Sequence, residues 1–112
     1  MKLDYNFTFL NEYINIERRN KYAAAKIKRD TTYACYLMLK GKPKLDVPCR
    51  LKFTWRVKNK RVDLDNCAFA KKYVLDGFVK AGLIPDDSMK YITEFTDTFV
   101  VDKNVGVDIT PY

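Results

Sequence analysis

Two pairs of aspartates stand close together in the sequence, and both could help to bind a cation. Asp63 and Asp65 belong to the segment DLDN, and Asp86 and Asp87 belong to the segment IPDD. Neighbouring carboxylates repel one another unless a cation, a proton or a hydrogen-bond donor lies between them. The chain has no histidine, so a metal site would depend on oxygen ligands, which favour Mg²⁺, Mn²⁺ or Ca²⁺.

Carboxylates grouped in this way are suited to phosphodiester hydrolysis. Mg²⁺ held by carboxylates promotes the in-line attack of water and stabilises both the attacking and the leaving oxygen. A nearby lysine would stabilise the charge that develops on the phosphate. Two carboxylates on a strand, with a third from the loop that follows the next helix, would form a suitable metal cage.

Helix capping is the ordinary explanation for the first pair of acids. Acidic residues just before a helix cap free N–H groups and favour the positive end of the helix, which accounts for one of the two, Asp65. A calcium-binding EF-hand loop is excluded, because counting from Asp63 the sixth residue is Ala68 and the twelfth is Val74, where glycine and glutamate are needed. From the residues alone, both a metal site and simple capping stay open.

The charge of the chain is unevenly divided. Residues 1–62 contain 16 Lys and Arg and 5 Asp and Glu, a net charge of +11, whereas residues 63–112 contain 5 and 9, a net charge of −4. A basic body with a small acidic cluster fits a protein that binds a polyphosphate and holds a divalent cation. Solubility alone would also account for a basic surface.

Composition limits the class of protein. With 112 residues, of which 47% are hydrophobic, the chain suits one globular domain over residues 1–112. No stretch approaches the roughly 20 apolar residues of a membrane span, and Asp4 and Asn6 interrupt any signal peptide at the start. The three cysteines are widely spaced and lack a CxxC pair, which favours reduced thiols in a cytosolic protein.

The hydrophobic pattern predicts an α+β domain, with one mixed sheet and two helices packed on it. Leu51, Phe53, Trp55 and Val57 alternate with polar residues, which is typical of a strand with a basic outer face. A turn or bulge at NKR then breaks the run, and the apolar parity switches to Val62 and Leu64; if these two point into the core, Asp63 and Asp65 share the opposite face. The expected elements are strands over 5–10 and 47–58, helices over 17–39 and 66–81 with Asn66 as a cap, and closing strands over 90–101 and 105–110 joined by a DKN hairpin.

Basic residues crowd the first half of the long predicted helix, and most of them lack an acidic partner four residues away. This favours a surface that binds the nucleic-acid backbone over a merely solvated face. Three more cations stand at the end of the basic strand and in the turn after it. The predicted DNA-binding residues are Arg18, Arg19, Lys21, Lys26, Lys28, Lys58, Lys60 and Arg61.

The combined motifs resemble those of the RusA-type Holliday junction resolvases. The resemblance consists of DLDN, a helix that contains LDG and KAG, and the DD pair, and it extends from Phe9 to Ile92 with an amino-terminal LNEYINIERRNKYAAAKIKR. It implies a RusA-like fold and a small homodimeric endonuclease that depends on Mg²⁺, with Mn²⁺ as a substitute. Such enzymes resolve four-way DNA junctions and are encoded by phages and prophages, which implies the cytoplasm of a bacterial host.

The resemblance also assigns roles to residues. Asp63, Asp65 and Asp87 match the three essential carboxylates of the family, which hold the metal ion, and Lys72 matches its catalytic helix lysine. About three extra residues separate DLDN from this lysine, which leaves Lys71 as a rival. Asp76 and Asp86 are secondary, Asp76 as an i,i+4 partner of Lys72 and Asp86 as an orienting residue.

Two other functions remain alternatives to junction resolution. One is a non-catalytic DNA-binding module of phage origin, in which the aspartates only cap helices. The other is a nuclease with the same chemistry that acts on flaps or other branched substrates.

Overall fold

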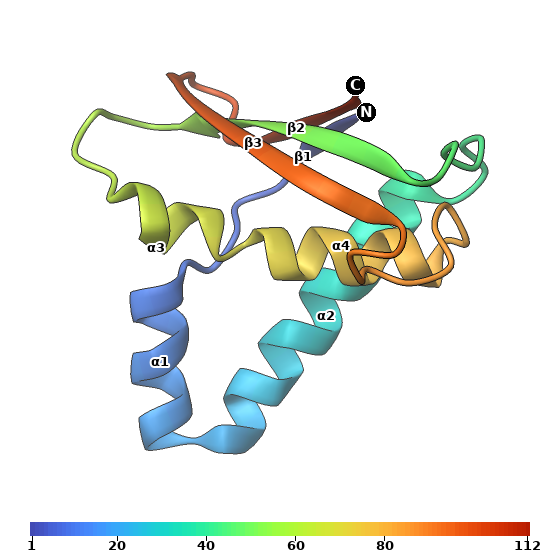
Figure 1. The fold of residues 1–112 in the computed structure, drawn as a ribbon. Coiled ribbons are helices and arrows are strands. Elements are labelled where there is room, and N and C mark those ends of the chain that lie inside the picture. The colour runs from blue at the N-terminus through green and yellow to red at the C-terminus, as the bar shows by residue number, and fades with distance from the viewer.

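Helices and a mixed sheet form two layers in the computed structural model, which describes residues 1–112. Figure 1 shows every helix on the same side of the sheet. The predicted α+β class and the mixed sheet are confirmed. The strands are β1 (Lys2–Asp4), β2 (Cys49–Val57), β3 (Ile92–Val101) and β4 (Gly106–Pro111), and the helices are α1 (Leu10–Arg19), α2 (Lys21–Leu39), α3 (Leu64–Ala68) and α4 (Lys71–Lys80).

Strand β2 lies inside the sheet, whose strand order is β1-β4-β2-β3. It pairs in parallel with β3 and antiparallel with β4, so α3 and α4 form the crossover between two parallel strands. The predicted DKN hairpin is wrong, because β3 and β4 lie on opposite sides of β2. The connection between them passes the end of β2, where the Asp102 N–H donates to the Val57 carbonyl oxygen at 2.9 Å.

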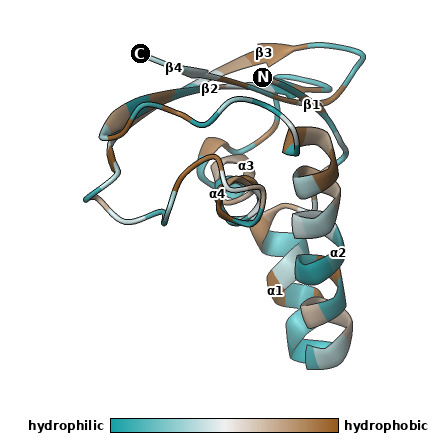
Figure 2. Cartoon of the chain, turned by 90° about the vertical axis from the view of Figure 1, so that its right-hand side faces the viewer, coloured by the Kyte–Doolittle hydropathy of each residue, from teal (hydrophilic) through white to brown (hydrophobic).

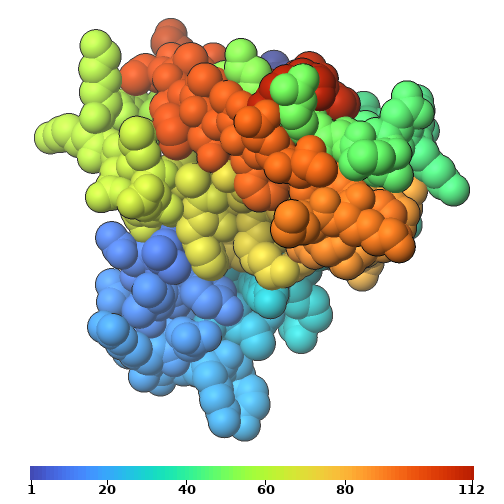
Figure 3. Space-filling model, viewed as in Figure 1, coloured from blue at the N-terminus to red at the C-terminus, as the bar shows by residue number.

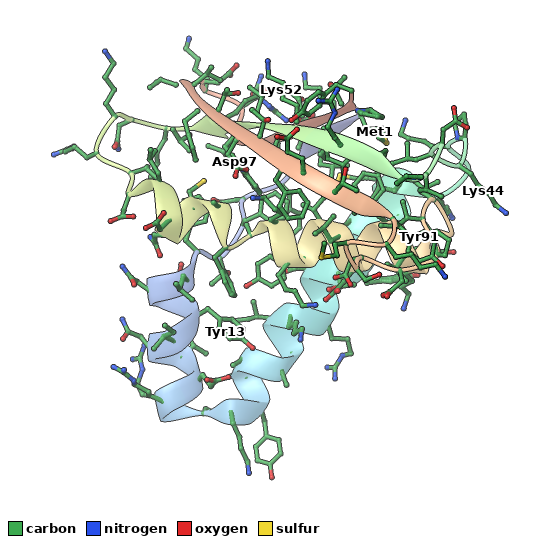
Figure 4. All side chains as sticks on the ribbon, in the orientation of Figure 1. Met1, Tyr13, Lys44, Lys52, Tyr91 and Asp97 are labelled. Atoms are coloured by element: carbon green, nitrogen blue, oxygen red, sulfur yellow. The ribbon has the colours of Figure 1, made fainter.

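The alternation predicted for β2 is confirmed. Leu51, Phe53, Trp55 and Val57 are buried, and they face the helices. Lys52 projects from the opposite face of the sheet, which no helix covers (Figure 4). The core therefore lies between the sheet and the helices α4 and α2, whose apolar side chains belong to the same buried cluster.

The amino-terminal strand is shorter and earlier than predicted. The sequence predicted a strand over 5–10, but β1 ends at Asp4 and α1 begins at Leu10. Strand β1 pairs with β4 at a point where a Cβ on Gly106 would lie only 2.1 Å from the Leu3 carbonyl oxygen. Gly106, whose φ is +153°, therefore permits this close approach.

The helix predicted over 17–39 is α2 together with the last residues of α1, and most of α1 was not predicted; the two helices form a hairpin that extends away from the sheet (Figure 1). The helical conformation is interrupted at Asn20, whose backbone is extended. The Asn20 side chain accepts hydrogen bonds from the N–H groups of Tyr22 and Ala23 at 3.0 and 3.1 Å. Asparagine caps helices well, so this residue ends α1 and begins α2 in the middle of a helix-favouring segment.

Helix α2 crosses α4 at Gly77, which packs against Cys35. A Cβ added to Gly77 would lie 2.6 Å from the Cys35 Cβ atom and 3.3 Å from the Tyr36 nitrogen. Both contacts involve atoms close to the main chain, which cannot move without moving the helices. The close crossing therefore depends on glycine at this position, despite the low helix propensity of glycine.

We expect Gly77→Ala to destabilise the protein by about 1–2 kcal/mol, because the cost of overpacking exceeds the gain in helix propensity. Urea unfolding followed by circular dichroism measures this change. Ala25→Gly, on the exposed face of α2, is the control for propensity alone and should cost about 1 kcal/mol. A Gly77→Ala variant more stable than the parent chain would show that α2 and α4 are not in close contact.

None of the helices is both long enough and apolar enough to cross a membrane.

Candidate functional site

Asp63 and Asp65 lie at the start of α3 rather than on a strand. Strand β2 ends at Val57, and the residues up to Val62 form turns and bends. Both aspartates are exposed. Asp63 is the N-cap of α3 and Asp65 lies in its first turn, so the prediction that the two carboxylates share one strand face is wrong.

The capping role belongs to Asp63, not to Asp65 or Asn66. The Asp63 carboxylate accepts a hydrogen bond from the Asn66 N–H at 3.3 Å, while Asp65 lies in the first turn of α3. Asn66 has a different role, since its Oδ1 atom accepts from the Asn11 N–H at 2.7 Å. This bond caps α1 and ties the base of the α1–α2 hairpin to α3, a contact that the sequence pattern did not indicate.

Lys72, Asp76 and Asp87 come together on the surface of α4. The Lys72 Nζ atom lies 3.0 Å from the Asp76 Oδ1 atom and 3.7 Å from the Asp87 Oδ2 atom. The predicted i,i+4 pair of Lys72 and Asp76 is therefore present. The loop after α4 folds back along the helix and brings in Asp87, whereas Asp86 is exposed and makes no ion pair.

The two carboxylates raise the pKa of Lys72 further above the neutral range. The hydrogen bond to Asp76 is the main cause that raises the pKa of Lys72; desolvation opposes it, and the charges of Asp76 and Asp87 add to it. A raised lysine pKa means that the ion pairs contribute fully below the unfolded-state pKa and are lost only as pH rises through the folded-state pKa. Lys72 is therefore a cation throughout the neutral range, with about half of its side chain exposed.

Lys71 has a different environment from its neighbour. Its Nζ atom lies 2.7 Å from the Asp97 Oδ2 atom on β3 and 4.5 Å from the centre of the Phe95 ring. Asp97, labelled in Figure 4, also accepts a hydrogen bond from the Trp55 Nε1 atom at 2.9 Å. The Lys71 side chain is only 15% exposed, so it links α4 to the sheet and is poorly placed to meet a phosphate.

The three predicted metal ligands are not grouped in this structure. No set of three or more acidic or cysteine side chains is close enough to hold one ion, and the Asp87 carboxylate is paired with Lys72 instead. The donor chemistry nevertheless fits Mg²⁺, because all three candidates are carboxylates and no histidine competes. Asp63 lines an open depression on the surface, together with Lys58, Arg61 and Glu12.

All eight predicted DNA-binding cations are exposed. Figure 3 shows the loop after β2 and the free end of the α1–α2 hairpin on the same side of the molecule, with α3 and α1 between them. Arg56, expected on the basic strand face, is only 5% exposed. The Arg56 guanidinium lies 2.7 Å from the Asp4 Oδ1 atom on β1 and 3.4 Å from the Asp108 Oδ2 atom on β4. Arg56 therefore links these strands to β2 and is not free to bind DNA.

Burial raises the pKa of all three cysteines. All three are free thiols, as predicted. Burial raises the pKa of Cys35 to about 12. Burial and the charge of Asp97 together raise the pKa of Cys67 to about 12. Because only the thiolate reacts readily, these thiols are poor nucleophiles at neutral pH.

Comparison of the chain with protein-family models, with curated proteins and with solved structures finds no match.

Proposed function

We propose that the chain is a Mg²⁺-dependent endonuclease that cleaves branched DNA, with four-way junctions as its substrate. The observation that carries this proposal is the contact of Lys72 with both Asp76 and Asp87. Asp87 lies 15 positions beyond Lys72 in the chain, yet the fold brings the two together. If a divalent cation took Asp87, both the cation and the released Lys72 would face a phosphate at this open surface.

The residues of the site would divide the work. Mg²⁺ bound by Asp63, Asp65 and Asp87 would supply activated water and neutralise charge on the phosphate. Lys72, freed from Asp87, would contact a phosphate oxygen and stabilise its developing charge. Asp76 would orient the Lys72 side chain through their ion pair. Lys58 and Arg61, beside Asp63, would hold the adjoining phosphates.

A homodimer would suit this substrate. A four-way junction has near two-fold symmetry, and its resolution requires two matched cuts, which a two-fold dimer would supply. Strand β3 supports such a dimer, because it is ten residues long and forms an edge of the sheet. Phe95, Val100 and Val101 on this strand are each more than two-fifths exposed, and an unprotected edge strand invites pairing with a second copy.

A labelled four-way junction, incubated with the protein with and without Mg²⁺, tests the proposal. We expect symmetrical cuts with Mg²⁺, none in EDTA, and little cleavage of a linear duplex of the same sequence. Sedimentation of the complex in Ca²⁺ should show two protein chains for each junction. Absence of cleavage with both Mg²⁺ and Mn²⁺ would rule out the endonuclease.

A DNA-binding module without catalytic activity is the second candidate. The capping hydrogen bond of Asp63 and the separation of the three carboxylates support it. In that case the protein would bind the junction with similar affinity and leave every strand intact, and the retained acids would serve helix capping and the Lys72 ion pairs.

A further inference from the structure

The free end of the α1–α2 hairpin exposes an aromatic ring among cations. We call residues 18–22 the hairpin tip; it contains Arg18, Arg19, Asn20, Lys21 and Tyr22. Tyr22 is 77% exposed, far more than any other aromatic residue of the chain. Figure 2 shows that this end of the hairpin is mostly hydrophilic, so the ring stands in polar surroundings.

Packing does not explain the position of the Tyr22 ring. The ring stacks on no other aromatic ring, and it makes one cation–π contact, with the Lys21 ammonium 5.5 Å from the ring centre. Tyr33 on the same helix is different, because its ring stacks on Tyr36 at 5.8 Å and lies under the Lys80 ammonium. A single exposed apolar side chain is ordinary on a protein surface. An exposed ring with several cations around it is unusual.

The surroundings of Tyr22 suit a polyanion with an exposed flat face. Residues 18–29 contain six cations and no acid. Ala25, one turn beyond Tyr22, is small and leaves room beside the ring. The backbone at Tyr22 is held by the Asn20 cap, so the ring is presented from a fixed position. Aromatic rings interleaved with cations bind nucleic acids by stacking on bases while the cations hold phosphates.

We infer that Tyr22 stacks on an unpaired or unstacked base at a branch point, while Arg18, Arg19 and Lys21 hold the flanking phosphates. A continuous duplex hides its base faces, whereas a branch point or a single strand exposes them. Helix α1 sets the distance from the proposed cleavage site, because its residues before the tip, 10–17, separate the tip from α3 by roughly 12 Å. This inference rests on the proposed function in one respect, namely that the ligand is a nucleic acid.

DNA binding measured in the absence of a divalent metal ion tests the inference. The affinities of the parent chain and of Tyr22→Ala are measured in EDTA for a four-way junction, a single strand and a continuous duplex. We expect Tyr22→Ala to weaken junction and single-strand binding about tenfold, which is about 1.4 kcal/mol, and to change duplex binding less than about twofold. Tyr22→Phe, which keeps the ring, should bind like the parent chain. Tyr33→Ala is the control for loss of an exposed tyrosine from the same helix.

The outcomes separate this inference from the endonuclease. If Tyr22→Ala weakens all three DNAs equally, or none of them, stacking at the tip is excluded even when the protein cleaves junctions. If the loss is selective but Mg²⁺ produces no cleavage, stacking is supported and the endonuclease is not. A parent chain that binds none of the DNAs but binds an acidic peptide through the tip would overturn the inference in favour of a protein partner.

Discussion

Asp63→Asn, Asp65→Asn and Asp87→Asn should each slow junction cleavage at least about 100-fold, a loss of about 2.7 kcal/mol of transition-state stabilisation. The amide keeps the shape of the side chain but loses the charge that holds Mg²⁺. Junction binding in Ca²⁺ should survive or tighten, since each change removes a negative charge near a bound phosphate. Cleavage rates and Mn²⁺ titration by calorimetry measure the two effects separately.

The capping interpretation predicts a different result for the same variants. The Asp63 side chain caps α3, and asparagine caps about as well as aspartate, so Asp63→Asn should leave folding and cleavage unchanged if capping were its only role. Asp46→Asn, in the loop between α2 and β2, is the control because Asp46 is exposed. Full cleavage by the Asp63 and Asp87 variants would exclude the metal site.

The parts of the fold that were predictable are those with a repeating pattern. The alternation in β2 is confirmed, and of the positions whose spacing predicted the buried stripe of the last helix, Ala70, Val74 and Phe78 are buried whereas Ala81 is half-buried; one side of each element faces the core. The stripe of α2 was displaced: the apolar spacing of the sequence put Ala23, Ile27, Ala34, Leu37 and Met38 toward the core, but Ala24, Thr31 and Cys35 are buried and Leu37 is 45% exposed. The close contact of Cys35 with Gly77 sets that rotation, and no pattern within α2 records it.

The connections were harder to predict because they depend on which elements become neighbours. Residues 102–105 are short enough for a hairpin, but they also suffice to pass the end of β2, since adjacent strands lie only about 4.8 Å apart. Parallel neighbouring strands are joined by a crossover, usually a helix, and the order strand, helix, strand was visible in the sequence. It would have favoured β3 as the parallel neighbour of β2.

The candidate site was predicted in its residues more than in its geometry. The i,i+4 spacing of Lys72 and Asp76 predicted their ion pair, since helical geometry fixes it locally. The contact of Lys72 with Asp87 depends on how the loop after α4 folds back, which no spacing gives. Two residues with tertiary roles were not identified as such: Asn66, which caps a distant helix, and Asp97, which holds Lys71.

The structure also turns the choice between the two helix lysines into a prediction with opposite outcomes. Lys72→Ala should slow cleavage at least about 100-fold and change the free energy of unfolding by less than about 1 kcal/mol, because its ion pairs are exposed to solvent. Lys71→Ala should leave cleavage largely intact under conditions where it is folded. It should also lower the unfolding free energy by about 2 kcal/mol, because Asp97 then loses its cation in a partly buried position.

Urea unfolding and single-turnover cleavage of both variants give the two quantities independently. Lys71→Met, which keeps the contact with the Phe95 ring but not the charge, separates packing from the ion pair. The pairing in the structure requires that the loss of stability follow Lys71 and the loss of activity follow Lys72. A Lys71→Ala variant that folds normally yet fails to cleave would reverse the assignment, because the extra residues after DLDN would then have rotated Lys71, not Lys72, toward the phosphate.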